Sequence, residues 1–251
     1  MNNIAISVEE VGMTFVSGKR KTEVFDNISF NVNKKELLCI VGPSGCGKST
    51  LLRIMLSLIE PSKGKVSISP QMDKESIAYI QQQPFLLPWR TLIQNAVLGV
   101  ELKNDLNSET IKRVKNLIEE YGLKGFEDYL PFELSGGMKH RAEIVRVLGS
   151  RAKLLFCDEP FTALDFVTRL DLNTRFKGMT KNYGVTTVFI THNIEEAIFL
   201  GDRIIVLGKK PAEIVSTHTV KLSIGSEDAV KCRQSPEFAD LFIKIWEDLR
   251  A

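Results

Sequence analysis

The run Gly42-Pro43-Ser44-Gly45-Cys46-Gly47-Lys48-Ser49-Thr50 constrains the fold of this chain more than any other feature. It follows the apolar residues 37–41 and precedes a second, mainly apolar stretch, 51–55. A strand, a glycine-rich turn and a helix in this order are the context that a phosphate-binding loop requires. Glycines let several N–H groups point at one anion, and the following helix adds its positive N-terminal end. We expect Lys48 to reach the β- and γ-phosphates and the Ser49 hydroxyl to hold Mg²⁺, with a tight turn of no further role as the alternative.

Length and charge exclude several classes of protein. The 251 residues are enough for one substantial α/β domain, or for a core with an inserted subdomain. A net charge of +2 gives no reason to expect nucleic-acid or lipid binding. No apolar run approaches the roughly 18 residues of a spanning helix, and residues 1–4 lack the basic and apolar regions of a signal peptide. The four cysteines show no metal or disulfide spacing, so we expect a cytosolic chain in which Cys46 is a packing residue or a reactive thiol.

Alternating and continuous apolar patterns predict the strands. Residues 4–10 and 27–32 alternate apolar and polar side chains, which predicts two half-buried strands of a small antiparallel sheet joined through a basic turn. Further strands are expected at 37–41, 65–68, 77–80, 154–157, 186–190 and 203–207. Helices expected at 165–181 and 194–200 alternate with the later strands, which indicates a mainly parallel sheet covered by helices.

The segment from about Pro84 to Ser150 has helical periodicity and no convincing strand. Ser108 is the expected N-cap of a helix over 109–120, and Gly122 is its expected stop. Another helix should begin at Ser135 and run to about Gly149.

Two further helix boundaries follow from proline. The helix after the phosphate loop should end near Glu60, because Pro61 and the residues after it break helices. Ser235-Pro236 should cap and open a final helix that runs through Leu249.

The apolar stretch 154–157 ends in two acids, Asp158 and Glu159. An acid at the carboxyl end of a strand beside a phosphate loop can coordinate Mg²⁺, which fits Asp158. The neighbouring Glu159 could polarise a water for attack on the γ-phosphate. The alternative is an ordinary pair of surface acids.

Two other positions carry weaker signals. Leu134-Ser135-Gly136-Gly137-Met138 is a second glycine-rich helix start, where Ser135 would expose its hydroxyl and nearby N–H groups to an anion. His192 follows the apolar residues 188–190 and could donate a hydrogen bond to a phosphate oxygen. Many helices begin Ser-Gly-Gly and many histidines lie in cores, so neither signal identifies a site by itself.

Together these elements resemble the nucleotide-binding subunit of an ABC (ATP-binding cassette) transporter, over about residues 4–217. The resemblance implies an α/β fold: a P-loop NTPase core of mainly parallel sheet with flanking helices, an N-terminal antiparallel β subdomain and an inserted α-helical subdomain. It implies a single ABC ATPase domain over 1–251. Its expected parts are a nucleotide-binding core at 1–83 and 151–217, a helical signature subdomain at 84–150, and a C-terminal tail and helix at 218–251.

The resemblance also implies roles for the motifs. It identifies the Walker A loop, the signature motif, the Walker B strand and the D-loop with residues 42–50, 134–138, 154–159 and 163–165, respectively. It makes Gln82 the Q-loop glutamine that contacts Mg²⁺ and the attacking water, and His192 the switch histidine. Phe15 falls where the family stacks an aromatic ring on adenine, with a plain core phenylalanine as the alternative.

Three stretches, 86–91, 158–165 and 195–200, resemble the ATPases of nitrate, sulfonate and taurine importers. They imply hydrolysis of ATP, with Mg²⁺, that powers import of a small anion through a separate permease. Trp89 is then expected in the groove that receives the permease, or else in the core. Thr162 and Asn193 depart from the usual Gly and Asp and leave open the geometry of their loops. His140, Glu143 and Val145 also depart from the usual pattern after the signature.

The family's mechanism implies a head-to-tail pair of copies. Ser135, Gly136 and Gly137 of one copy would cover the γ-phosphate bound at the Walker A loop of the other, and Glu159 would orient the attacking water. The implied partners are a second copy, an integral membrane permease and, indirectly, a solute-binding protein, with no nucleic acid. The implied location is peripheral, at the cytoplasmic face of the membrane. A soluble ABC ATPase not coupled to transport is the alternative, and the sequence does not identify the solute.

Overall fold

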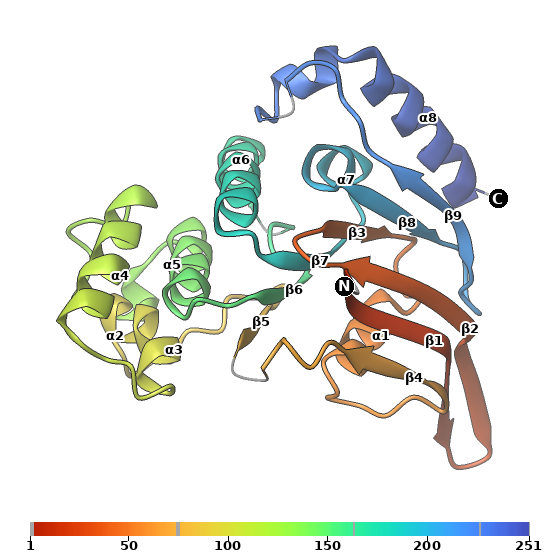
Figure 1. Cartoon of the computed structure of the whole chain (residues 1–251), viewed down its shortest axis with the longest axis horizontal. Coiled ribbons are helices and arrows are strands. Elements are labelled where there is room, and N and C mark those ends of the chain that lie inside the picture. Colours follow the sequence, from red (N-terminus) through yellow and green to blue (C-terminus); the bar gives the residue numbers. More distant parts are fainter. Residues whose placement is uncertain (1–2, 74–75, 163, 226, 251) are drawn as a thin grey trace. The chain divides into compact units, whose positions relative to one another are not determined.

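The computed structural model describes residues 3–73, 76–162, 164–225 and 227–250. The chain divides into two compact units (Figure 1). The first unit comprises residues 1–72 and 173–251, and the second comprises residues 73–172.

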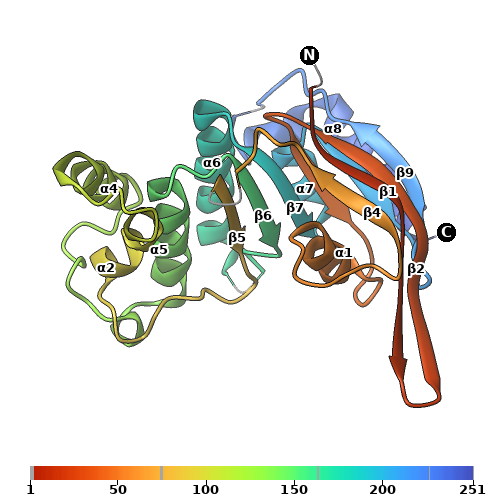
Figure 2. The ribbon, with the colours of Figure 1, turned by 60° about the horizontal axis from the view of Figure 1, so that its bottom comes forward.

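An antiparallel sheet in the first unit contains β1 (Ile4–Ser17), β2 (Arg20–Asn33) and β4 (Lys63–Ile68), in the order β2-β1-β4. The β1–β2 hairpin is longer than the alternation predicts, because pairing continues to Ser17↔Arg20 through several register shifts that interrupt the period-2 pattern. Its tip extends well beyond β4 (Figure 2).

The first unit also contains the strands β7 (Thr186–Thr191), β3 (Leu37–Val41), β8 (Arg203–Leu207) and β9 (Ile214–Thr219), in this spatial order. β3 pairs in parallel with both β7 and β8. All residues of β3 and β7 are buried, which explains the continuous apolar run of β3 and the apolar centre of β7 at 188–190. β9, which pairs antiparallel with β8, was not expected, because its half-exposed residues give only a weak pattern.

The helical elements of the first unit are α1 (Lys48–Met55), α7 (Ile194–Leu200), the 3-10 turn η3 (Lys231–Gln234) and α8 (Pro236–Arg250). The prediction that α1 reaches Glu60 is wrong. Ser57 has a φ of 57° in the left-handed region, and the N–H of Leu58 donates to the carbonyl of Arg53 at 2.9 Å. This C-terminal turn closes the helix before the chain reaches Pro61.

The second unit contains two parallel strands, β5 (Ile77–Ile80) and β6 (Leu154–Asp158). Its helical elements are α2 (Leu92–Ala96), α3 (Leu98–Glu101), α4 (Ser108–Glu120), the 3-10 turn η2 (Pro131–Glu133) and α5 (Gly136–Gly149). Residues 84–150, all of them described, contain no strand, as predicted. α6 (Phe166–Tyr183) begins in this unit and ends in the first.

The cap of α4 differs from the prediction. Asn107, not Ser108, is the N-cap, and its Oδ1 accepts from the N–H groups of Glu109 and Thr110 at 3.0 Å each. The Thr110 hydroxyl oxygen accepts in return from the Asn107 N–H, which completes a capping box. The sequence offered two adjacent capping residues, and the reciprocal contact with Thr110 selects the first.

Across the described residues, every helix is too short or too polar to pass through a bilayer.

Candidate functional site

Glycines shape the loop between β3 and α1. Gly45 and Gly47 have φ values of 78° and 114°, which glycine adopts far more readily than other residues. A Cβ at Gly47 would lie 2.4 Å from Val24 Cγ1, so even alanine does not fit without movement. The N-cap of α1 is Gly47, which has no side chain to form a capping hydrogen bond, and the N-terminal end of a helix favours an anion.

The Lys48 ammonium lies at the centre of this loop. The side chain is buried, and its Nζ donates to the carbonyls of Gly42 at 2.8 Å and Pro43 at 3.1 Å. The loop thus concentrates a positive charge and backbone donors where a phosphate would bind. Cys46 is only 2% exposed, which favours the packing role over that of a reactive thiol.

His192 lies immediately after β7 on an ordered turn. Val41 and Thr191 are register partners, so the phosphate loop and His192 leave adjacent parallel strands at the same edge of the sheet. The Thr191 hydroxyl donates to buried Glu196 at 2.5 Å, and Asn193 caps α7 by accepting from the Glu196 N–H at 3.1 Å. Asn193 therefore serves in the capping role for which Asn and Asp are equally suited.

Phe15 lies near the tip of the β1–β2 hairpin, opposite Thr22. Its side chain is 47% exposed, which excludes the reading of a plain core phenylalanine. The ring is available for stacking on a base.

In the second unit, three predicted site residues lie at the carboxyl-terminal edge of the parallel pair β5–β6. Ile80 and Cys157 are register partners, so Gln82 leaves β5 at the edge where β6 ends in Asp158 and Glu159. The exposed Gln82 and the two acids thus lie at, or just beyond, the carboxyl ends of two adjacent parallel strands.

Glu159 adopts an unusual backbone conformation. Its φ of 48° lies in the left-handed region, a strain that proteins retain mainly at functional sites. The Thr162 hydroxyl donates to Glu159 Oε2 at 3.3 Å. Thr162 therefore contributes a hydrogen bond to this carboxylate that the usual glycine would not provide.

The signature segment begins α5 in the way the sequence predicts. Ser135 is the N-cap, and its Oγ accepts from the Met138 N–H at 3.3 Å. Leu134 is buried, whereas Ser135 and Gly136 are exposed and Gly137 is half-buried. The buried leucine anchors a helix N-terminus whose polar groups face outward.

The predicted D-loop is only partly described, because Ala163 lies outside the described residues. Asp165 Oδ1 accepts from the Thr168 N–H at 3.0 Å at the start of α6. This backbone hydrogen bond lowers the pKa of the Asp165 carboxyl.

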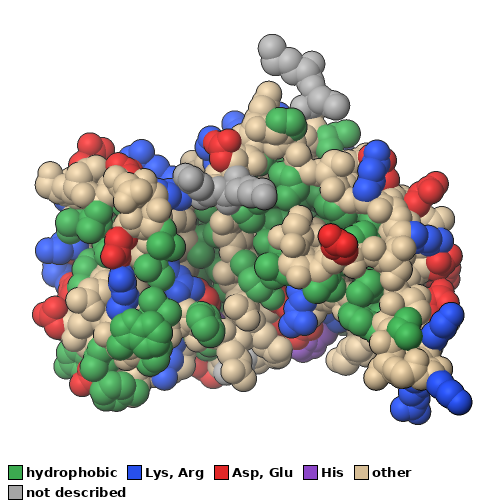
Figure 3. Space-filling model, turned by 90° about the horizontal axis from the view of Figure 1, so that it is seen from below, with side chains coloured by type: hydrophobic (Ala, Val, Ile, Leu, Met, Phe, Trp, Pro, Cys, Tyr) green, Lys and Arg blue, Asp and Glu red, His purple; other side chains and the backbone are tan. Residues whose placement is uncertain are grey.

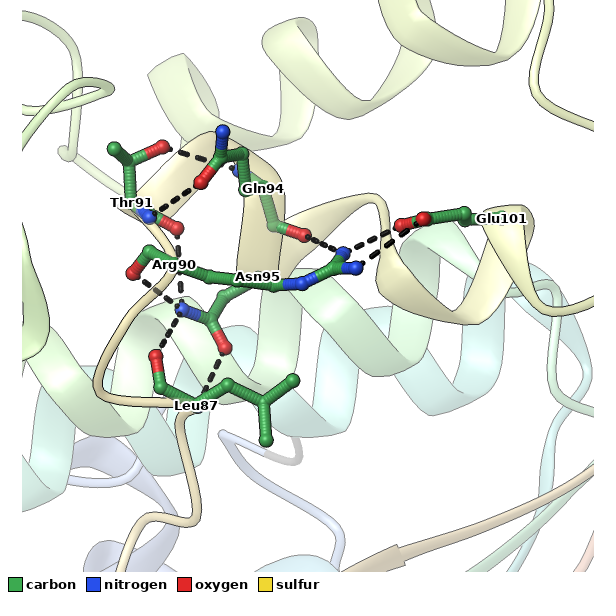
Figure 4. A network of polar contacts seen from close by, with 6 residues as sticks. All are labelled: Leu87, Arg90, Thr91, Gln94, Asn95 and Glu101. Atoms are coloured by element: carbon green, nitrogen blue, oxygen red, sulfur yellow. Dashed lines mark hydrogen bonds and ion pairs between the residues drawn. The ribbon is translucent and has the colours of Figure 1, made fainter.

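Buried and surface polar groups hold the segment after Gln82 (Figure 4). Asn95 is fully buried, and its Oδ1 accepts from the Leu87 N–H at 2.7 Å. Its Nδ2 donates to the carbonyls of Leu87, Arg90 and Thr91. Arg90 also pairs with Glu101 at 2.5 Å. Trp89 is 73% exposed, so it is not a core residue.

Sequence reasoning did not single out Asn95. The Thr91-x-x-Gln94 capping box, which begins α2 in the structure, was a detectable signal for a helix at this point. The four hydrogen bonds of Asn95 had no such signal, since its partners lie in a segment without regular secondary structure.

A cavity of about 330 Å³ lies between β5, α3 and α5. Its apolar wall includes Leu98, Leu102 and Val147, and two cations, Lys103 and Arg146, also line it. The space-filling view shows hydrophobic side chains gathered on the face of this helical region (Figure 3). The exposed large hydrophobic residues from this region are Phe85, Trp89, Leu102, Leu106, Tyr129 and Phe132.

Comparisons with known proteins agree with this arrangement. The family model described as "ABC transporter" matches residues 25–162. An uncharacterized ABC transporter ATP-binding protein, YtlC of Bacillus subtilis, is 38% identical over 249 residues, covering 98% of this chain and 96% of the relative. The aliphatic sulfonates import ATP-binding protein SsuB 2 of Pseudomonas syringae pv. tomato is 38% identical over 201 residues, covering 80% of this chain and 82% of the relative.

A solved structure is also similar. It is a dimeric, post-hydrolysis state of the ATP-binding cassette MJ0796 bound to ADP and Pi. The TM-score is 0.75 at 28% identity, and the match covers 86% of this chain and 99% of that one. The chain therefore belongs to the ABC transporter ATP-binding family, with the mixed α/β fold of that family and its ATPase activity.

Proposed function

We propose that this chain hydrolyses ATP to power the import of a small solute, such as a sulfonate, nitrate or taurine, through a separate membrane permease. The observation that carries the hydrolytic part is the parallel pairing of β5 with β6, which places Gln82, Asp158 and Glu159 at the same edge of the sheet. Similarity to sulfonate import ATPases supports the choice of an importer. The proposed parts of the chain are a nucleotide-binding core at 1–83 and 151–217, a helical signature subdomain at 84–150, and a C-terminal tail and helix at 218–251.

The chemistry of the donors suits ATP with Mg²⁺. Lys48 and the first turn of α1 would bind the phosphates, with Phe15 stacked on adenine. Ser49, Gln82 and Asp158 supply hydroxyl, amide and carboxylate oxygens, the hard donors that Mg²⁺ prefers. When bound, Mg²⁺ neutralises charge that develops on the phosphates.

The chain's own residues then perform the remaining steps. Glu159 orients a water in line with the γ-phosphate, and Thr162 holds the Glu159 carboxylate. His192 donates a hydrogen bond to a phosphate oxygen.

A second copy completes the site in this proposal. Ser135, Gly136 and Gly137 of that copy would cover the γ-phosphate with the exposed N-terminus of α5. The dimeric state of the ADP- and Pi-bound cassette supports this pairing.

Coupling to a permease would use the helical region. The cavity lined by Leu98, Leu102 and Val147 can take apolar side chains from a partner, and exposed Trp89 adds to the apolar surface of the same unit. We propose that a cytoplasmic helix of the permease binds here, which would place the chain at the cytoplasmic face of the membrane. A solute-binding protein would act through the permease.

The central experiment uses three variants of the full chain. Glu159→Gln should form ATP-dependent dimers with little turnover, Lys48→Ala should lose ATP binding or turnover, and Ser135→Arg should block dimer closure while one chain still binds ATP. Size-exclusion chromatography with ATP and a phosphate-release assay measure these outcomes. Wild-type turnover in Glu159→Gln, or recovery of nucleic acid rather than a permease with the native protein, would contradict the proposal.

A further inference from the structure

Two charged residues of α5 hold the peptide groups on both sides of Phe85. Glu143 Oε1 accepts from the Phe85 N–H at 3.3 Å, and Arg146 Nη1 donates to the Phe85 carbonyl at 2.6 Å. Arg146 Nη2 also donates to Glu143 Oε1 at 2.9 Å. The three residues therefore form a closed set of hydrogen bonds, with Glu143 fully buried and the Arg146 side chain 16% exposed.

Hydrophobic packing does not explain this pair. Two well-packed apolar residues would fill the same space at equal or lower cost, because a buried ion pair loses much solvation. The pair binds main-chain groups of Phe85, although Phe85 as a whole residue is 63% exposed. These contacts therefore fix the backbone conformation at Phe85. Two apolar side chains could not fix it, because they make no hydrogen bonds.

The place of Phe85 in the chain gives this restraint a consequence. Phe85 lies three residues after Gln82, in a segment without regular secondary structure. Glu143 and Arg146 lie on α5, the helix that Ser135 caps, and Arg146 also lines the 330 Å³ cavity. The pair thus joins the loop of Gln82, the signature helix and the proposed permease groove within one unit.

We infer that Glu143 and Arg146 are positioning residues for ATP hydrolysis: they clamp the Phe85 backbone to α5, so that the Gln82 loop and the signature helix move together. The inference deepens the proposed function and rests on it. Neither residue needs to touch nucleotide for this role.

The geometry predicts which substitutions the clamp tolerates. Only one carboxylate oxygen, Oε1, makes both contacts, and Oε2 accepts no hydrogen bond from the described residues. Glu143→Gln keeps an acceptor at the working position, so it should preserve the clamp. Arg146→Lys keeps the charge but loses the planar fork that reaches two acceptors at once, so it should weaken it.

The test compares these variants with the double variant Glu143→Leu/Arg146→Met, which replaces the pair with apolar side chains of similar size. Hydrogen exchange of the segment 81–89 reports the clamp directly, because the Phe85 N–H is one of its donors. ATP affinity and kcat of the full chain are measured in parallel. Glu119→Gln is the matched control, since it removes an exposed ion pair with Lys124 from the same unit.

We expect faster exchange at 81–89 in the double variant, with kcat lower by about tenfold or more and ATP affinity unchanged. Arg146→Lys should show a smaller change of the same kind and provides the test if the double variant does not fold. Glu143→Gln and Glu119→Gln should match the wild type. Wild-type kcat in a folded variant with fast exchange, or unchanged exchange in the double variant, would overturn the inference, as would equal losses of kcat and ATP affinity.

Failure of this inference differs from failure of the proposed function. If Lys48→Ala retained full ATPase activity, the proposed function would fail while the exchange result at 81–89 still reported the clamp. If Lys48→Ala lost activity and the double variant kept it, only the clamp's role would be refuted.

Discussion

The loop before α1 and the segment before α2 both follow a buried or partly buried strand, but they are shaped by different forces. The phosphate loop takes its form from its own backbone, with Gly45 and Gly47 in left-handed conformations and Lys48 folded onto neighbouring carbonyls. Side chains from elsewhere hold the segment 81–91, since Asn95 binds its second half and residues of α5 bind Phe85.

This difference predicts different responses to mutation. A loop shaped by glycine fails when a Cβ is added, because no neighbouring side chain can restore its dihedral angles. A loop held by distant side chains tolerates changes to its own residues, but it loses its conformation when the side chain that holds it is removed. The first loop is therefore sensitive within the motif, and the second is sensitive outside it.

The largest expected effect is that of Gly47→Ala. Left-handed strain and the 2.4 Å approach to Val24 together cost about 2–5 kcal/mol, so ATP affinity should fall about 100-fold or more. Isothermal titration with ATP measures this. Gly45→Ala is the matched control, because a Cβ there meets nothing within 4 Å and adds only the strain of its φ. Equal losses in the two variants would show that packing against Val24 is unimportant.

The next effect concerns pH and Glu143. Burial raises the pKa of the Glu143 carboxyl from 4.5 to about 7, whereas Arg146 opposes the shift. Between about pH 4.5 and pH 7 the Glu143 carboxyl is protonated in the folded chain and ionised in the unfolded chain. The free energy of unfolding therefore falls as pH rises through this range. The fall should be at most about 3 kcal/mol and should be absent in Glu143→Gln. Urea unfolding of both proteins across this range measures it, and identical curves would refute the shift.

Asn95→Leu should destabilise the second unit by about 2 kcal/mol, because the Leu87 N–H and three carbonyls lose a buried partner. Urea unfolding gives the magnitude, and hydrogen exchange at 87–91 gives the location. Gln94→Ala removes only the exposed capping contact to Thr91 and should cost less. A larger loss of stability in Gln94→Ala than in Asn95→Leu would show that the capping contact, and not Asn95, holds this segment.

The smallest effect should come from Arg90→Gln, which removes the ion pair with Glu101 near the surface. Exposed pairs contribute little and are screened by salt. The midpoint of thermal unfolding should drop less than in Asn95→Leu, and the difference from wild type should shrink in high salt. A drop equal to that of Asn95→Leu would show that the Arg90–Glu101 ion pair, and not only Asn95, is a main restraint on the segment 81–91.

Much of the fold could be predicted from local patterns of apolar residues in the sequence. The buried strands 37–41 and 186–190, the parallel arrangement and the helical character of 84–150 were all predicted from runs and periodicities, and the structure confirms them. Such features depend on short stretches of chain, and a short window of sequence contains their cause. The longer hairpin and β9 were missed, since their pairing depends on neighbouring strands rather than on their own weak alternation.

The amino-acid sequence by itself determined the phosphate loop, the two acids after β6 and the capped start of α5, because glycine dihedrals, apolar runs and caps act over a few residues. Only the tertiary structure decided that the strands before Gln82 and before Glu159 pair in parallel. It alone also decided that Phe85 is held by residues 58 and 61 positions later in the chain. Strand register and buried hydrogen bonds join groups that are distant in the chain, so no local pattern contains them.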